Sequence, residues 1–448
     1  MTAIAGSSKA DSAPQGIKTF LVIWIGQLIS MLGSGLTGFA LGVWIFDQTG
    51  QATPFALTIL FANLPRILLL PVAGSLADRW NRRSVMILSD FGNAVVTVSV
   101  FVLLQFGTLQ FWHIYLIATL GSVFSAFQEP AYTASITMLI PKKDLSRANG
   151  MMQMGQALEM VITPVIAGVL FVVIGLSGIL VIDFVTFLFA VGTLLIVRIP
   201  QPKLTEHGEK KASIWADALF GWNYLKARPG LFGLLWYYAM VNFLLNWSTV
   251  LTGPMILSRF PASTLGMIQM FIGFGMLAGG ILSSLWAGPR RKISAVIGFI
   301  GLSLVGMCIA GLRPSPYSIG AGLLWMMVCI PLASASSNAL FQSKVAPEVQ
   351  GRVFSIRAMI SRSVMPVAFL LAGPLADYVF NPLLETNGAW ADTFLGALLE
   401  TGPGRGIGLM MLASALVGIL VTVLAYANPH IRNIEDELPD ALPAASDE

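Results

Sequence analysis

Charged residues are scarce in this sequence, and so are cysteine and histidine. Asp, Glu, Lys and Arg make up 11% of the 448 residues, less than half of the roughly 25% found in ordinary soluble domains. The two cysteines and three histidines have no zinc-binding spacing, and no phosphate-binding loop ending in Gly-Lys-Ser/Thr occurs. We therefore expect no catalytic residues, no metal site and no cofactor. The net charge of +4 is spread over short segments, which argues against a nucleic-acid partner.

Long hydrophobic runs fill most of the chain instead. Hydrophobic residues account for 56% of it, and a helix needs about twenty apolar residues to cross a bilayer. The runs predict an all-α membrane protein with twelve transmembrane helices in two pseudo-symmetric six-helix bundles. The first six are expected near residues 18–46, 53–77, 84–106, 112–140, 147–172 and 176–198, and the second six near 230–257, 264–288, 293–312, 316–343, 351–378 and 406–428.

Polar segments divide the chain. Lys and Arg concentrate in the connections that would be cytoplasmic if both termini lie inside, so we expect a multi-pass protein of the cell membrane with that orientation. The middle segment contains an amphipathic pattern from Ile214 to Lys226, which predicts a helix on the membrane surface. The expected parts are a disordered N-terminus at 1–17, one bundle at 18–198, a linker at 199–228, a second bundle at 229–428 and an acidic, solvated cytoplasmic tail at 429–448.

An internal repeat supports two related halves. Shifting the sequence by 206 residues places Gly74 on Gly280 and Trp80 on Trp286. A small residue followed by Gly, any residue and Leu also ends four spans, at Gly74, Gly168, Gly280 and Gly373. This pattern is expected if each half consists of inverted three-helix units. The alternative is that small residues recur wherever membrane helices pack closely.

The connection between the second and third spans reads Gly-Ser-Leu-Ala-Asp-Arg-Trp-Asn-Arg-Arg over residues 74–83. It resembles the conserved loop of the major facilitator superfamily, in which an acid latches the two halves of the transporter together. The resemblance gives Asp78 that role, against the positive end of a helix. The alternative is that Asp78 only holds its own loop through Arg82. Asn81 replaces the family glycine and tolerates its left-handed backbone. The latch residues are Gly74, Asp78, Arg79, Arg82 and Arg83.

A second stretch narrows the resemblance. Residues 127–131 and 141–150 look like the branch of the superfamily that contains macrolide-efflux-type and siderophore-export permeases. That branch implies an exporter of amphipathic small molecules that works by alternating access in exchange for protons, with the proton gradient as its energy source. A small-molecule substrate, protons and the lipid bilayer are then the partners, and a monomer is expected. A lipid or lysophospholipid flippase of the same fold and a membrane sensor without transport remain alternatives.

Charges inside the membrane are the candidates for energy coupling, because each is costly there. Glu129 and Arg66 both lie about 18 Å from the cytoplasmic end of their helices at 1.5 Å per residue, so a pair is expected. Glu159 lies in the middle of the fifth span. We predict that Glu129, Arg66 and Glu159 couple transport to protons, and purely structural ion pairs are the alternative. Asp90 and Asp183 are expected to be structural, and Arg357 to reach the membrane surface.

Neutral polar residues recur at helical spacing on several spans and could line a substrate cavity. Hydrogen bonding between helices would equally explain them. Arg362, which lies deeper along its helix than Arg357, is included with them. The candidates for substrate contact are Gln27, Ser34, Tyr132, Tyr238, Asn242, Asn246, Asn338 and Arg362.

Overall fold

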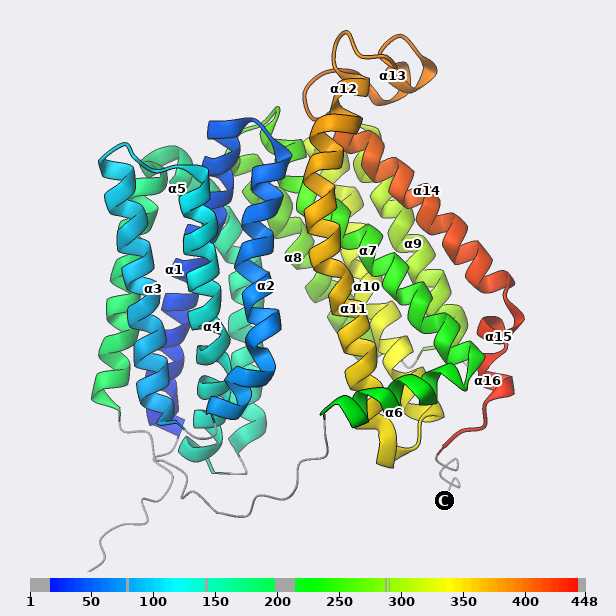
Figure 1. Cartoon of the computed structure of the whole chain (residues 1–448), viewed down its shortest axis with the longest axis horizontal. Coiled ribbons are helices and arrows are strands. Elements are labelled where there is room, and N and C mark those ends of the chain that lie inside the picture. The colour runs from blue at the N-terminus through cyan, green and yellow to red at the C-terminus, as the bar shows by residue number, and fades with distance from the viewer. Residues whose placement is uncertain are drawn as a thin grey trace, which may run out of the picture. The chain divides into compact units, whose positions relative to one another are not determined.

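Eleven long helices dominate the computed structural model, which describes residues 17–77, 80–141, 144–197, 214–286, 288–289 and 291–441. These residues contain helices and no strand, which confirms the all-α membrane class. The long helices are α1 (Ile17–Thr49), α2 (Ala52–Ala77), α3 (Arg82–Gln105), α4 (Phe111–Leu139), α5 (Leu145–Ile196), α7 (Pro229–Leu257), α8 (Ala262–Leu285), α9 (Lys292–Leu312), α10 (Pro316–Lys344), α11 (Pro347–Leu375) and α14 (Arg405–Ala427) (Figure 1).

The helix lengths agree with the expected number of crossings. In the described residues, ten helices are long and apolar enough to span a membrane. Helix α5 has 52 residues and is interrupted at Gly175, whose φ of 64° only glycine adopts at little cost. It therefore supplies two of the expected spans, and the 29-residue α4 is long enough to supply another. The arrangement is consistent with the twelve predicted spans.

In the second half of the chain, short helices lie above and below the long helices in the view of Figure 1. Helix α6 (Ile214–Lys226) forms where the amphipathic pattern predicted a helix, and it packs on α11. A Cβ on its Gly221 would lie 2.7 Å from the carbonyl oxygen of Arg352, so the two backbones approach closely. The remaining short helices are η2 (Ala376–Phe380), α12 (Asn381–Leu384), α13 (Phe394–Leu399), α15 (Pro429–Arg432) and α16 (Ile434–Glu437).

The chain folds into two compact units, which do not coincide with the two halves of the sequence. Unit 1 comprises the described residues of Met1–Gly38, Phe61–Glu159 and Ile174–Glu206. Unit 2 comprises those of Phe39–Leu60, Met160–Val173 and His207–Glu448. The division into two six-helix bundles joined by a linker remains a prediction.

Glycines explain why short pieces of the first half belong to unit 2. A Cβ on Gly266 of α8 would lie 2.2 Å from the carbonyl oxygen of Pro164, so α5 and α8 touch backbone to backbone. A Cβ on Gly373 of α11 would lie 2.4 Å from the Cα of Thr53 in α2. Such close approaches are typical of membrane helices, which associate through small residues rather than through a hydrophobic driving force.

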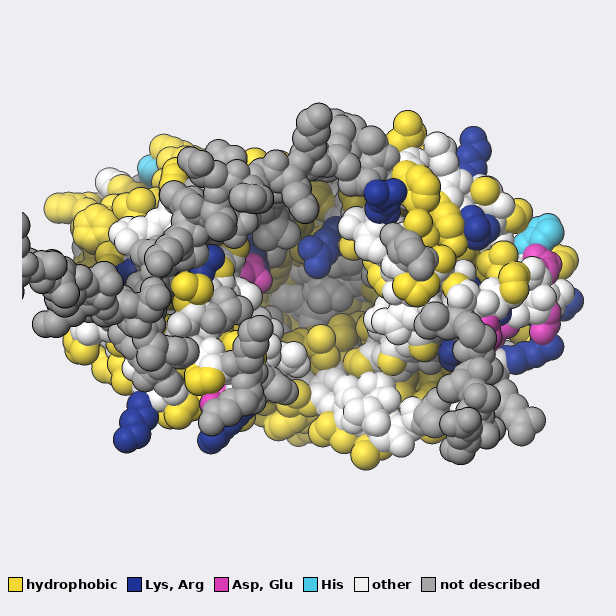
Figure 2. Space-filling view, turned by 90° about the horizontal axis from the view of Figure 1, so that it is seen from below, with side chains coloured by type: hydrophobic (Ala, Val, Ile, Leu, Met, Phe, Trp, Pro, Cys, Tyr) yellow, Lys and Arg dark blue, Asp and Glu magenta, His cyan; other side chains and the backbone are white. Residues whose placement is uncertain are grey.

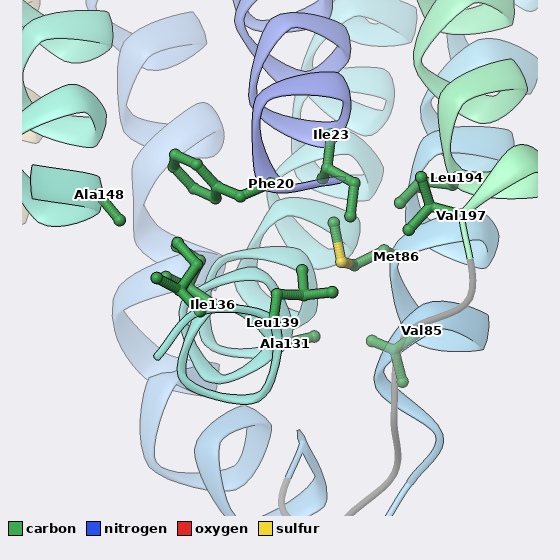
Figure 3. Close-up of a cluster of buried hydrophobic side chains, with 11 residues drawn as sticks. Phe20, Ile23, Val85, Met86, Ala131, Ile136, Leu139, Ala148, Leu194 and Val197 are labelled. Atoms are coloured by element: carbon green, nitrogen blue, oxygen red, sulfur yellow. The ribbon is translucent and has the colours of Figure 1, made fainter. Parts of the chain in front are cut away.

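A cluster of buried apolar side chains joins helices of unit 1 (Figure 3). Phe20 and Ile23 of α1 and Met86 of α3 belong to it, and all three are fully buried. Residues of α4 and α5 complete the cluster, and Trp24 and Tyr132 pack against it from the adjoining pocket. The cluster therefore holds together four of the five helices that line the candidate site.

The acidic tail corrects one expectation. In place of a solvated end, residues 429–441 fold back on unit 2. Lys344 is only 8% exposed and donates hydrogen bonds to the carbonyl oxygens of Glu435 and Leu438. The carboxylate of Glu435 accepts hydrogen bonds from the first N–H groups of α9, where the positive end of the helix dipole favours an acid. The sequence showed that the tail is acidic, but it did not show that the tail binds the buried Lys344.

Figure 2 shows the face that is lowest in Figure 1, with the described Lys and Arg side chains at several separate places on it.

Candidate functional site

A pocket of about 560 Å³ opens inside unit 1 and is lined by all five of its long helices. Its wall combines charged and amide groups with large apolar side chains, including Trp24, Met31 and Met152. A mixed lining of this kind suits ligands that have both an apolar body and polar groups. The predicted residues in this wall are Gln27, Ser34, Arg66, Glu129, Tyr132 and Glu159.

The central contact in this pocket is an ion pair between α2 and α4. The Nη2 atom of Arg66 lies 2.6 Å from Oε2 of Glu129, and its Nε lies 3.2 Å from the same oxygen. The two side chains are 48% and 47% exposed, so water reaches the pair. The expectation that these two residues pair is confirmed, because equal depth on neighbouring helices brings them together. Their role in coupling remains a proposal.

Glu159 of α5 is the second carboxylate in the same pocket. It is partly buried, and no hydrogen bond or ion pair joins it to another residue in the part of the chain that the structure describes. With Arg66 already paired to Glu129, the pocket has one acid more than it has bases. One carboxylate is therefore available to hold a proton or to meet a positively charged group.

An amide network lies behind the pocket and was only partly foreseen. Asp90 of α3 is fully buried and accepts hydrogen bonds from Nε2 of Gln27 at 3.1 Å and Nε2 of Gln128 at 2.5 Å. Gln128 also donates to Oε1 of Gln27 at 3.0 Å. The structural role expected for Asp90 fits this network, since it joins α1, α3 and α4. Gln128 was missed, although its position beside Glu129 was a usable signal.

Some other polar side chains of unit 1 hydrogen-bond to a neighbouring helix, and one has no partner among the described residues. Thr37 of α1 does not line the pocket and donates to Asp183 at 2.7 Å. Thr97 donates to the same carboxylate oxygen at 3.1 Å. The hydroxyl of Tyr132 lies buried at the pocket without a hydrogen-bond partner among the described residues.

A second pocket, of about 430 Å³, lies in unit 2 and centres on Arg357 of α11. The guanidinium of Arg357 donates to Oδ1 of Asn338 and to Oγ of Ser337, both at 2.9 Å. The expectation that Arg357 reaches the membrane surface remains a prediction. Asn338 lines this pocket as a predicted cavity residue. The sequence indicates how deep Arg357 lies along its helix, but not that a neighbouring helix offers it two acceptors.

The remaining cavity candidates are more scattered. Tyr238 donates to the carbonyl oxygen of Ala333 at 3.3 Å and lies 5.5 Å from the Arg357 guanidinium. Asn246 donates to the carbonyl oxygen of Asn242 at 2.8 Å, and neither residue lines the two pockets described above. Arg362 is exposed and lies outside both.

The predicted latch is only partly described. Asp78 and Arg79 lie outside the described residues, and Gly74 lies within α2. Arg82 donates to the carbonyl oxygen of Ala134, and Arg83 donates to those of Leu194 and Leu195. These bonds attach the start of α3 to α4 and α5.

Asn81 corrects a detail of the same segment. Its φ is −63°, not left-handed, and its side chain accepts a hydrogen bond from the N–H of Ser84. Asn81 therefore caps α3, a position at which Asn is among the best residues.

Comparisons with known sequences agree with this picture. The family model described as Major Facilitator Superfamily matches residues 23–369. Macrolide efflux protein A of Streptococcus pyogenes is 28% identical over 377 residues, which cover 80% of this chain and 90% of that protein. Multidrug efflux pump Tap of Mycolicibacterium fortuitum is 22% identical over 374 residues, which cover 80% and 89%.

Solved structures share the fold. A bacterial homolog of the human lysosomal transporter Spinster, in an inward-facing and unoccupied conformation, matches with a TM-score of 0.68 at 17% identity, covering 97% of this chain and 100% of that one. The nucleoside transporter NupG matches with a TM-score of 0.63 at 12% identity, covering 91% and 98%. At these identities the likeness concerns the fold alone.

Proposed function

Because this chain belongs to the Major Facilitator Superfamily, we propose that it exports amphipathic small molecules across the cell membrane by alternating access, in exchange for protons. The observation that carries the proposal is the pocket in unit 1, where the Arg66–Glu129 pair and the carboxylate of Glu159 share one wall with tryptophan and methionine side chains. Relatives named as macrolide and multidrug efflux proteins match most of the chain, which supports export as the direction.

The three charged groups suggest how a proton is exchanged. Protonation of Glu129 removes the charge that holds Arg66, and Arg66 is then free to attract the carboxylate of Glu159 in the same pocket. Among the described residues, the titratable and charged groups that share the pocket with Glu129 are Arg66 on α2, Tyr132 on α4 and Glu159 on α5. Asp90 of α3 lies behind the pocket and accepts a hydrogen bond from Gln128, the residue next to Glu129. A substrate with a positive group would compete with the proton for these acids.

Alternating access also requires contacts that break when one end of the protein opens. Unit 2 contains suitable ones. The carboxylate of Asp377 caps the first turn of α2, and the backbones of α5 and α8 touch at Gly168 and Gly266. These contacts are hydrogen bonds and close backbone approaches at glycines rather than contacts between large apolar side chains.

Transport by reconstituted protein tests the proposal. Proteoliposomes with an imposed pH gradient should accumulate a radiolabelled macrolide or an amphipathic cationic dye, and accumulation should stop when a protonophore removes the gradient. Liposomes without protein are the control. A protein that binds these compounds but moves none of them under any gradient would contradict transport and would favour a sensor.

A further inference from the structure

Arg357 stands out in unit 2 because it carries a charge inside a membrane-spanning helix without an acidic partner. Among the described residues, no Asp or Glu side chain forms an ion pair or hydrogen bond with it. The nearest charged residues on either side of it along α11 are Arg352 and Arg362, both also positive. An uncompensated charge at such a position is costly and marks a functional site by default.

The guanidinium is held in place rather than free to move. Asn338 and Ser337 of α10 each accept one hydrogen bond at 2.9 Å. The ring of Phe341 lies 4.5 Å from the guanidinium carbon, and the ring of Tyr238 lies 5.5 Å from it. Cation–π contacts of this kind orient an arginine but do not neutralise it. The group is therefore fixed and still charged.

The fixed guanidinium of Arg357 has N–H donors that form no hydrogen bond with the described residues. It has five N–H donors, and the two hydrogen bonds to α10 use two of them, which leaves three for a ligand. Planar donors of this kind bind carboxylate and phosphate oxygens in pairs, and an arginine that is already oriented loses little entropy when it does so. Gln342 and Ser361 line the same pocket and add an amide and a hydroxyl donor.

The remaining lining of this pocket is apolar and suits an apolar part of the ligand. Phe354 and Ala358 lie beside Arg357 on the same face of α11 and are apolar. A cavity of about 430 Å³ is large enough for an acidic group and part of an apolar body. We propose that Arg357, with Gln342 and Ser361, binds the carboxylate or phosphate group of an amphipathic anion. This inference rests on the proposed transport function and adds amphipathic anions to the substrates of that function.

Direct binding tests the inference without any need for transport. Purified full-length protein in a neutral detergent is titrated with dodecanoate, dodecyl phosphate and lysophosphatidic acid, and with dodecyltrimethylammonium as a cation of similar length. Tryptophan fluorescence reports binding. Arg357→Gln should weaken binding of the anions about tenfold or more, because a charge-assisted bond is lost, and Arg357→Lys should restore part of it. Binding of the cation should not change.

Arg432→Gln is the matched control, since Arg432 is exposed and belongs to neither pocket. Circular dichroism and gel filtration confirm that each variant is folded. Tighter binding of lysophosphatidic acid than of dodecyl phosphate would assign a membrane lipid as the source of the anion, and equal or weaker binding would assign a soluble one.

Two outcomes overturn the inference. One is the absence of saturable anion binding to the unmodified protein, and the other is equal binding by the protein and its Arg357→Gln variant. Because no gradient is involved, anion binding through Arg357 by a protein that transports nothing would support this site and reject the transport function. Efflux by a protein that binds no anion would support the transport function and reject this site.

Discussion

The carboxylate of Asp377 caps the helix that begins beside Thr53, although the two residues are 324 positions apart. One Asp377 oxygen accepts hydrogen bonds from the N–H and the hydroxyl of Thr53 at 2.7 and 2.6 Å, and the other accepts from the N–H of Ala52 at 2.9 Å. A carboxylate at a helix N-terminus satisfies free N–H groups and interacts well with the helix dipole.

We predict that Asp377→Ala favours the opening of this contact. Loss of a helix cap costs about 1 kcal/mol, which corresponds to about a fivefold shift between two states. The measurement is the rate at which a thiol reagent labels a cysteine that replaces Ala56, a fully buried residue of α2, with Cys308 and Cys329 changed to alanine.

Asp392→Asn is the control for this experiment, because Asp392 is an exposed acid between α12 and α13. Labelling should rise about fivefold with Asp377→Ala and stay constant with the control. Identical labelling rates for both variants would show that the cap does not restrain opening.

The bounds of the long helices could be predicted from the sequence to within a few residues. Two of these helices, α7 and α10, begin at Pro229 and Pro316, and proline is favoured in the first turn of a helix. Depth along a helix could also be predicted, which is why the Arg66–Glu129 pair was expected and found. The direction in which a side chain points around its helix could not, because packing of other helices decides it. Gln128 and the two acceptors of Arg357 on α10 were missed for that reason.

The Arg66–Glu129 pair should matter little for stability. Half-exposed ion pairs contribute about 0–1 kcal/mol, and both side chains are about half exposed. Arg66→Gln and Glu129→Gln should therefore each change the thermal unfolding temperature by only a few degrees. Their effects on efflux should be large and not additive, since each substitution removes the same contact.

A double-mutant cycle measures this. The variant with both substitutions should show efflux as low as either single variant and a similar melting temperature. A fall in melting temperature that parallels the loss of efflux would assign the pair a structural role instead.

Glycine contacts give a third prediction. Of the glycines in the repeated small-Gly-x-Leu pattern, Gly168 and Gly373 touch the backbone of another helix, whereas a Cβ on Gly280 would meet nothing within 4 Å. The repeat predicts close packing, but not which copies are in contact. A side chain in the close contact between α5 and α8 should push the two helices apart.

Gly266→Val should destabilise unit 2, since overpacking costs about 1–3 kcal/mol and even a Cβ would overlap the carbonyl oxygen of Pro164. Thermal unfolding in detergent is the measurement, with Gly280→Val as the matched control. Equal melting temperatures for the two variants would mean that α5 and α8 separate without cost.

Proton movement coupled to substrate tests the central claim most directly. Proteoliposomes that enclose a pH-sensitive dye receive a transported macrolide without an imposed gradient, and the internal pH is followed for the unmodified protein, for Glu129→Gln and for Glu437→Gln. Glu437 is the control, because it lies in the tail and pairs with His430 away from the pocket. The account predicts a substrate-dependent pH change with the unmodified protein and with Glu437→Gln, and none with Glu129→Gln. A pH change of equal size with Glu129→Gln would contradict it.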